Sequence, residues 1–299
     1  MKKVLKWLGI LLAGLVGLLL IVFLVGFLLS ERRIDKTYTL DDESLTLPTD
    51  AASLTEGQRL VSIRGCVDCH EPDFGGGAFI DDPMIGTFAA ANLTSGEGSA
   101  TAGYTVADWE QAIRHGVGAD GHSLIIMPSY EFAGLSDEQV AQMVAYLTSL
   151  PPVDRVAAEP QLGPLGRALF VMNQLPLLPA EMVDHSAAHP AAFPAEASVE
   201  YGRYMAATCT GCHMPNLAGG VVPGSAPGDL PSANLTPAGN LGHWTLEDFQ
   251  RTLRDGVTPE GKELDPAVMP WPLTAQMTEV ELEALWLYLQ SLPPTEPAG

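Results

Sequence analysis

The sequence predicts a mainly α-helical protein in which an N-terminal transmembrane helix is followed by two copies of one small domain with long loops. Three observations support this prediction. An uninterrupted apolar run covers residues 7–29, which is long enough to span the hydrocarbon core of a bilayer as a helix. The remainder of the chain repeats the same short motifs in the same order. In both copies, helix-start patterns alternate with loops rich in Gly, Ala and Pro.

The apolar run has the flanks of an anchor. It follows Lys2, Lys3 and Lys6, and the residues at its end, 28–33, lack the small-residue pattern of a signal-peptidase site. We therefore predict an uncleaved signal-anchor over residues 1–35. Basic residues also follow the run, so the charge bias gives only a weak indication of orientation.

A five-residue string occurs twice in the chain, as Cys66-Val67-Asp68-Cys69-His70 and as Cys209-Thr210-Gly211-Cys212-His213. C-x-x-C-H is the attachment pattern of c-type haem. Two thiols three positions apart can form thioethers to the two vinyl groups of one porphyrin, and the histidine that follows can bind the iron. The chain has 4 cysteines, all of them in these strings. We therefore predict two covalently bound haem c groups, with iron ligands His70 and His213.

Two other chemistries use a CxxC pair, namely zinc binding and a redox disulfide. A zinc site would need further Cys or His residues at matching spacing. A thioredoxin-like site would need a strand followed by a helix. The sequence shows neither arrangement around the motifs.

The repeat defines the predicted domains, at residues 50–152 and 196–299, with a connector rich in Pro and Ala at 153–195. Residues 91–94 match 233–236, and both copies close with Ser-Leu-Pro-Pro. The long loops 73–103 and 214–243 are predicted to pack around the haem. His185 and His189 in the connector are expected to be exposed or locally bonded. Capping patterns predict helix starts at Ser53, Thr105, Ser136, Thr245 and Thr278.

The repeat also indicates the sixth iron ligand. Met127 and Met269 occupy equivalent positions after the two motifs, and each is followed by Pro. The other Met and His residues have no such partner in the other copy. Axial Met raises the reduction potential of a haem and leaves no open position for a substrate, so the predicted work is outer-sphere electron transfer. Arg114 and Arg254 also match, and we predict that they contact haem propionates.

Over most of residues 50–299, and most specifically at the two CxxCH motifs and the two Met-Pro positions, the chain resembles the membrane-bound class I cytochromes c, and in particular the cytochrome subunits of periplasmic alcohol, gluconate and related sugar dehydrogenases. Those subunits typically carry three haem motifs, whereas this chain has two. The resemblance implies two tandem cytochrome c domains that pass electrons from a dehydrogenase toward quinone or a terminal oxidase. Covalent haem attachment predicts that the haem domains lie on the periplasmic side of the inner membrane, because c-type cytochromes mature outside the cytoplasmic membrane. In the second copy, the residues that carry the resemblance are 243–245, 248–249, 253–257, 260–261, 269–270 and 287–289.

The charge of the chain restricts its partners. Lys+Arg number 15 against 36 Asp+Glu, which gives a formal net charge of -21. Such a surface repels nucleic acid and favours basic partners. The expected partners are redox proteins, with a membrane dehydrogenase or oxidase complex as the candidate. We expect an electron carrier between a dehydrogenase or bc-type donor and a soluble cytochrome or terminal oxidase. The alternative is a di-haem enzyme, such as a peroxidase or a thiosulfate dehydrogenase, although the latter uses a Cys ligand and no spare Cys exists.

Overall fold

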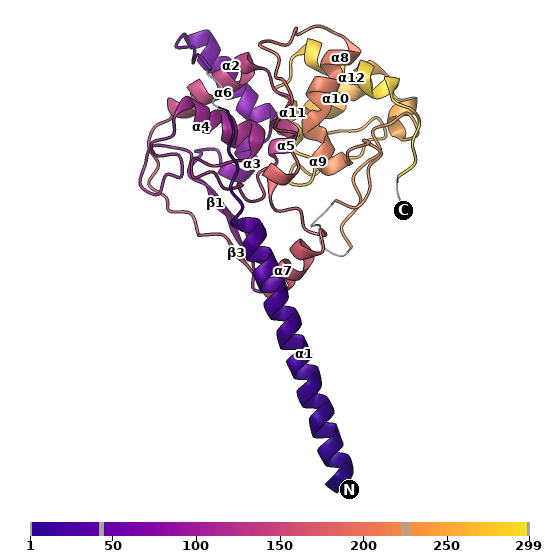
Figure 1. Cartoon of the computed structure of the whole chain (residues 1–299). Helices are drawn as coiled ribbons and strands as arrows, with labels where there is room; N and C mark the ends of the chain where they lie inside the picture. The colour runs from indigo at the N-terminus through magenta and orange to yellow at the C-terminus, as the bar shows by residue number, and fades with distance from the viewer. Residues whose placement is uncertain (1, 42–44, 223–224, 226–227, 298–299) are drawn as a thin grey trace.

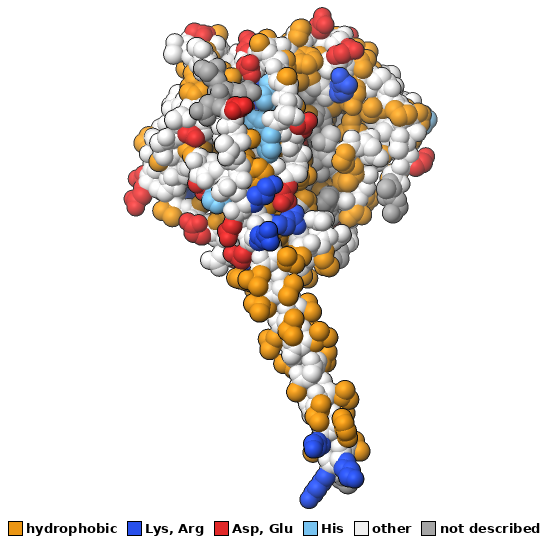
Figure 2. Space-filling model, viewed as in Figure 1, with side chains coloured by type: hydrophobic (Ala, Val, Ile, Leu, Met, Phe, Trp, Pro, Cys, Tyr) orange, Lys and Arg blue, Asp and Glu red, His pale blue; other side chains and the backbone are white. Residues whose placement is uncertain are grey.

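The long N-terminal helix stands apart from the rest of the protein. The computed structural model describes residues 2–41, 45–222, 225 and 228–297. Helix α1 (Lys2–Ile34) projects from one side of a helical body (Figure 1). Its apolar side chains are exposed along the stalk, and basic side chains mark its free end (Figure 2). With a mean hydropathy of 3.1 over its most apolar stretch, it is the one helix in the described parts of the chain that is long and apolar enough to cross a membrane.

The body repeats one order of helices, as the mainly α prediction requires. The first half contains α2 (Ala51–Ile63), α3 (Cys66–His70), α4 (Val106–Glu110) with its π-helical continuation η1 (Gln111–His115), α5 (Ser129–Phe132) and α6 (Asp137–Thr148). The second half contains α8 (Val199–Met205), η3 (Ala206–Cys209), α9 (Thr210–His213), η4 (Asn240–His243), α10 (Leu246–Asp255), α11 (Trp271–Thr274) and α12 (Glu279–Ser291).

In each half the first and last long helices cross closely, α2 on α6 and α8 on α12. A glycine permits each crossing. A Cβ atom at Gly57 would overlap the carbonyl oxygen of Gln142, and one at Gly202 would overlap that of Ala284. The crossing places the CxxCH motif, which follows each first helix, against the core of its own half.

Capping residues set the helix starts, in agreement with the sequence at four of five positions. Thr105 and Thr245 form complete capping boxes with the aspartate three residues later, and Ser136 and Thr278 cap the last helices. The predicted start at Ser53 is wrong. Helix α2 begins at Ala51 because Asp50 is the cap, and its carboxylate accepts a hydrogen bond from the Ser53 amide at 3.0 Å.

The loop predicted at 73–103 contains a hairpin that the sequence analysis missed. Strands β1 (Gly77–Asp82) and β2 (Gly86–Ala90) pair antiparallel, and β3 (Gln161–Leu162) of the connector pairs with β2. The register of β1 and β2 shifts between Ala78 and Ile80. Most side chains of β1 are exposed or half-buried, so the strand lacks the alternation of apolar and polar residues that predicts a sheet.

The connector clamps the end of α1. It contains α7 (Pro164–Val171) and η2 (Pro179–Glu181), and α7 packs against α1. Arg33 of α1 forms an ion pair with Glu181 at 2.5 Å and donates to the Phe170 carbonyl at 2.9 Å. In the opposite direction, Arg167 of α7 forms an ion pair with Glu31 at 2.5 Å. We call these contacts the stalk clamp.

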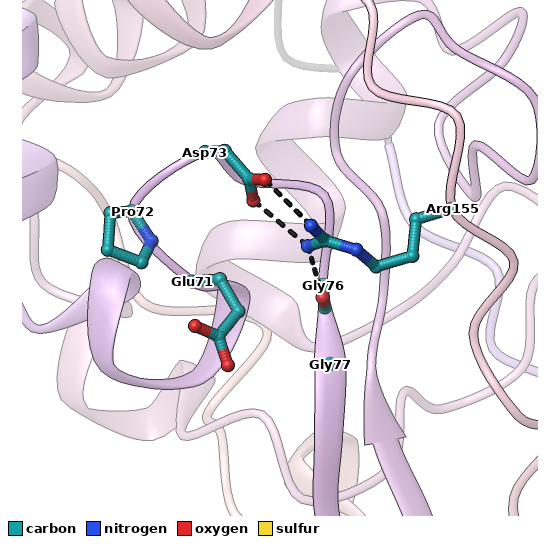
Figure 3. A pocket seen from close by; sticks show the side chains of 6 residues that line it. All are labelled: Glu71, Pro72, Asp73, Gly76, Gly77 and Arg155. Atoms are coloured by element: carbon teal, nitrogen blue, oxygen red, sulfur yellow. Dashed lines mark hydrogen bonds and ion pairs between the residues drawn. The ribbon is translucent and has the colours of Figure 1, made fainter.

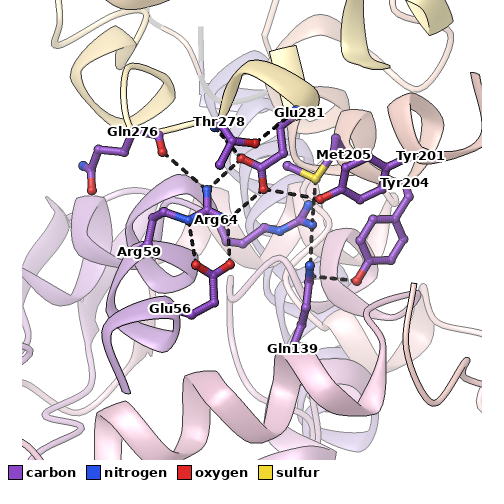
Figure 4. A network of polar contacts seen from close by, with 10 residues as sticks. All are labelled: Glu56, Arg59, Arg64, Gln139, Tyr201, Tyr204, Met205, Gln276, Thr278 and Glu281. Carbon is purple, nitrogen blue, oxygen red and sulfur yellow. Dashed lines mark hydrogen bonds and ion pairs between the residues drawn. The ribbon is translucent and has the colours of Figure 1, made fainter. Parts of the chain in front are cut away.

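The two halves share one hydrophobic core, which includes residues of α2 and α6 as well as α8 and α12. Polar contacts also cross between them (Figure 4). Arg59 of α2 donates to both carboxylate oxygens of Glu281 in α12, at 2.7 and 2.8 Å. Arg64, which is 3% exposed, donates to the Met205 sulfur at 3.5 Å and lies over the Tyr204 ring. The halves therefore form one body.

Candidate haem sites

Both CxxCH histidines are held in the same way. Nδ1 of His70 lies 2.8 Å from the Ala91 carbonyl oxygen, and Nδ1 of His213 lies 2.8 Å from that of Ala233. A carbonyl oxygen can only accept, so Nδ1 carries the proton in each ring and Nε2 keeps its lone pair. A backbone carbonyl on the far nitrogen is the usual orienting partner of a metal-binding histidine.

The backbone around each histidine is also equivalent. The residue after the histidine has a positive φ, of 65° at Glu71 and 67° at Met214, which non-glycine residues rarely adopt. The histidine carbonyl then accepts a hydrogen bond at 3.1 Å from the amide of Gly76 in the first half and of Gly219 in the second. Strained non-glycine residues of this kind persist only where the surrounding structure fixes them.

The donor set fits haem c. Burial lowers the pKa of His70 and of His213, which keeps both imidazoles neutral and able to bind iron. Burial raises the pKa of the Cys66 and Cys209 thiols to about 12. Cysteines of redox dithiol sites have a lowered pKa instead, so these thiols do not fit that alternative. Among the described residues, no group of three or more His, Cys, Asp or Glu is placed to hold a metal ion such as zinc.

In each half, the loop that follows the CxxCH histidine, here called the histidine loop, is hydrogen-bonded to the C-terminal tail of the same half. The Asn92 amide donates to the Val153 carbonyl at 2.7 Å, and the Asn234 amide donates to the Thr295 carbonyl at 2.8 Å. These asparagines follow the alanines that orient the histidines. The match between residues 91–94 and 233–236 was the sequence signal for this role, but the spacing alone did not assign it.

A shallow pocket beside the first motif shows a contact without a counterpart in the repeat (Figure 3). Arg155 of the connector donates to both carboxylate oxygens of Asp73, at 3.0 and 2.8 Å, and to the Gly76 carbonyl at 2.8 Å. The connector thus ties down the loop that follows His70.

Met127 and Met269 lie in equivalent places. Both are half-buried and pack against the shared core, and the carbonyl of each accepts from the amide two residues on, at 2.9 and 2.6 Å. Each directly precedes Pro and a short helix, α5 or α11. Their role as iron ligands stays a prediction.

The matched arginines bind the first residue of the last helix in each half. Arg114 donates to Asp137 at 2.7 Å and also forms an ion pair with Glu110, and Arg254 donates to Glu279 at 2.7 Å. Arg114 is fully buried, whereas Arg254 is partly exposed. These contacts join the middle helix to the last helix. Contact with haem propionates stays a prediction for both.

One cluster was not expected from the sequence. His185 of the connector is locally bonded, with Nε2 at 2.9 Å from the Ala180 carbonyl, but its Nδ1 also lies 3.0 Å from Nδ1 of His115 in η1. The His189 ring packs against His115 with the centroids 5.6 Å apart. These three rings fasten the connector to the first half, and no spacing rule in the sequence would bring them together.

Comparison with known proteins agrees with this geometry. The cytochrome c family model matches residues 54–151 and 199–293, which are the two halves with their CxxCH motifs. A di-haem c-type cytochrome of Cereibacter sphaeroides is 29% identical over 272 residues, covering 81% of this chain and 86% of its own length.

Two dehydrogenase subunits are similar as well. The cytochrome c subunit of a quinone-dependent alcohol dehydrogenase from Gluconacetobacter polyoxogenes is 28% identical over 85% of this chain, and the fructose dehydrogenase cytochrome subunit of Gluconobacter japonicus is 27% identical over 85%. The chain spans 58% and 56% of the lengths of these two relatives. Two family matches on one chain, each with a CxxCH histidine oriented through Nδ1, lead to one conclusion: this protein belongs to the cytochrome c family.

Proposed function

We propose that the chain is a membrane-tethered di-haem electron carrier. Cys66 and Cys69 would attach one haem, and Cys209 and Cys212 the other. The residues that would bind the iron are His70 with Met127 for the first haem and His213 with Met269 for the second. The observation that carries the proposal is the identical orientation of the two histidines by the Ala91 and Ala233 carbonyls.

The residues of the chain would bind each haem, orient its iron ligands and shield it from solvent. When bound, haem supplies a one-electron Fe(II)/Fe(III) couple. Nε2 of each histidine and the sulfur of each methionine would bind the iron, so that no ligand site would be left for a small-molecule substrate. The asparagine-sealed tails would keep the histidine loops rigid, so that little rearrangement accompanies electron transfer.

The proposed partners follow from the relatives and the charge. Subunits of alcohol and fructose dehydrogenases are among the similar proteins, and a dehydrogenase complex is therefore the proposed donor. A soluble cytochrome or a terminal oxidase is the proposed acceptor. Helix α1 would hold the body on the periplasmic face of the inner membrane, and the net charge of -21 would favour a basic docking surface on the partner.

Haem content is the direct test. We expect two haem c groups per chain by pyridine haemochrome assay of the detergent-purified protein. The double variants C66S/C69S and C209S/C212S, which serve as controls for each other, should each retain one. A total of one haem in the wild type would contradict the proposal. A high-spin resting iron that turns over peroxide would favour the enzyme alternative instead.

A further inference from the structure

A carboxylate of the first half lies against the haem motif of the second. Glu131 sits on α5, the short helix that follows Met127 and Pro128, and α5 packs against η3. A Cβ atom at Gly211 would overlap Oε1 of Glu131. Gly211 is one of the two residues between the cysteines of the second motif, so its missing side chain makes room for this carboxylate.

The charge of Glu131 reaches both motifs. Burial, followed by the charge of Glu131, raises the pKa of Cys209 and of Cys212 in the second motif. In the first motif, burial and the charges of Asp68 and Glu131 raise the pKa of Cys69. These thiols would be thioethers once haem is attached. The Glu131 carboxylate is therefore in contact with the second motif at Gly211 and within electrostatic range of the first at Cys69.

The negative charge of the Glu131 carboxylate is stabilised by few neighbouring groups. The structure gives the carboxylate no hydrogen-bond donor among the described residues, and Arg64 is the cation whose charge acts on it. Burial raises the pKa of Glu131 to about 8, although the charge of Arg64 opposes the rise. The side chain is half-buried rather than sealed, so it can exchange a proton with solvent.

The other ionisable groups around α5 are engaged elsewhere. Elements η1 and η2 pack against α5 and carry Arg114, His115 and Glu181. These contact Asp137, His185 and Arg33, respectively. On the motif side, the groups that interact electrostatically with Glu131 are Arg64, Cys69, Cys209 and Cys212, together with its neighbour Tyr130 in α5. Asp68 acts on the same cysteines, Cys69 and Cys212.

We propose that Glu131 is a redox-linked proton site shared by the two haem motifs. Its carboxylate takes a proton from solvent when a haem attached at either motif accepts an electron from the redox partner, and releases it when that electron leaves. The inference rests on the proposed function, because it needs haem at these motifs.

The direction in which the reduction potential changes with pH follows from the charges of the iron and the carboxylate. Reduction removes one positive charge from the iron, which makes a nearby carboxylate harder to ionise and raises the pKa of Glu131. By linkage, protonation of Glu131 must favour the reduced haem equally. The reduction potential therefore falls as pH rises through the Glu131 pKa. A tenfold change in proton affinity between the two redox states corresponds to about 59 mV for a one-electron couple.

The test is a spectroelectrochemical titration of the full-length protein between about pH 6.5 and 9.5, which brackets the Glu131 pKa of about 8. In the wild type we expect the potential of at least one haem to fall across this range. Glu131→Gln should remove that dependence. Glu283→Gln, at an exposed position on α12, should leave it unchanged.

Two results would overturn the proposal: pH-independent potentials in the wild type, or a wild-type slope in Glu131→Gln, which would assign the effect to another group such as a propionate. If Glu131→Gln does not fold, redox-difference infrared spectra of the wild type decide. A carboxylic acid C=O band should appear on reduction near pH 8, and its absence would refute the proposal. Failure of the proposed function is distinguishable, because it would show beforehand as fewer than two haems per chain.

Discussion

The two ring nitrogens of each CxxCH histidine have different roles. Nδ1 of His70 and His213 is held 2.8 Å from a backbone carbonyl, and this bond fixes the ring so that Nε2 is available to iron. The orienting group is a main-chain atom, so no side chain in the sequence identifies it. The CxxCH motif predicts the histidine ligand, but only the fold shows which backbone carbonyl orients its ring.

The methionine assignment can be tested one residue at a time. We expect Met127→Ala and Met269→Ala each to remove about half of the Met-to-iron charge-transfer absorption of the oxidised protein and to convert one haem to high spin, because each would supply one thioether ligand. Magnetic circular dichroism of the ferric and ferrous states checks this. Met172→Ala, at an exposed position in the connector, is the control. An unchanged band in either ligand variant would refute that assignment.

At the scale of elements, helices were predictable and strands were not. The capping boxes at Thr105 and Thr245 are local patterns, and the structure contains both. Strands β1 and β2 form a local hairpin, but β1 lacks the alternating pattern that would predict a strand. The pairing of β2 with β3, some 70 residues later in the loop-rich connector, is encoded by no local pattern. The π-helical turn η1 has likewise no compositional signature.

The asparagine seals give a prediction at this scale. Asn92 is fully buried and donates to the Val153 and Arg155 carbonyls, whereas Asn234 donates to the Thr295 carbonyl alone. A buried carbonyl that loses its donor costs about 1–3 kcal/mol. We therefore expect Asn92→Ala to lower the free energy of unfolding more than Asn234→Ala. Guanidinium unfolding followed at the Soret band measures both, with exposed Asn240→Ala as the control. The reverse order would show that the tails are not held mainly by these amides.

At the scale of the whole molecule, the sequence predicted two copies of one domain and a connector, but not the contacts that join the two copies into one body. Arg59 and Glu281 are separated by 222 residues, and their contact joins the halves (Figure 4). Glu281 is the third residue of α12, where the first copy has Gln139 in α6, so the repeat does not show the charge that makes the contact. The interface could not be predicted because a repeat shows only what the copies share, whereas a contact between copies uses residues in which they differ.

This ion pair predicts a pH dependence. Burial alone would raise the pKa of Glu281, but hydrogen bonds from Arg59 and Thr278 hold it below its ordinary value. The resulting stability is present above the unfolded-state pKa and is lost as pH falls through the folded-state pKa. Arg59→Met leaves burial dominant, which raises the pKa and should move acid unfolding to higher pH.

We also expect Arg59→Met to lower the free energy of unfolding at neutral pH by about 3 kcal/mol, because the Glu281 side chain, 1% exposed, would be a buried charge without its cation. Denaturant titrations at several pH values measure both effects. Arg203→Met, on the exposed face of α8, is the control. Equal acid midpoints in the two variants would show that Glu281 keeps its low pKa without Arg59.

The stalk clamp bears on where electrons can be delivered. A carrier on a slack tether sweeps a wide volume and can shuttle between distant sites. Here α1 continues to Ile34 and is fixed to the connector by Arg33 and Arg167, so a body anchored by this helix would stand at a set height and tilt above the lipid. The height of the body above the membrane would then restrict its partners. Among membrane proteins, only those whose own redox centre lies at that height would exchange electrons with it, whatever their affinity.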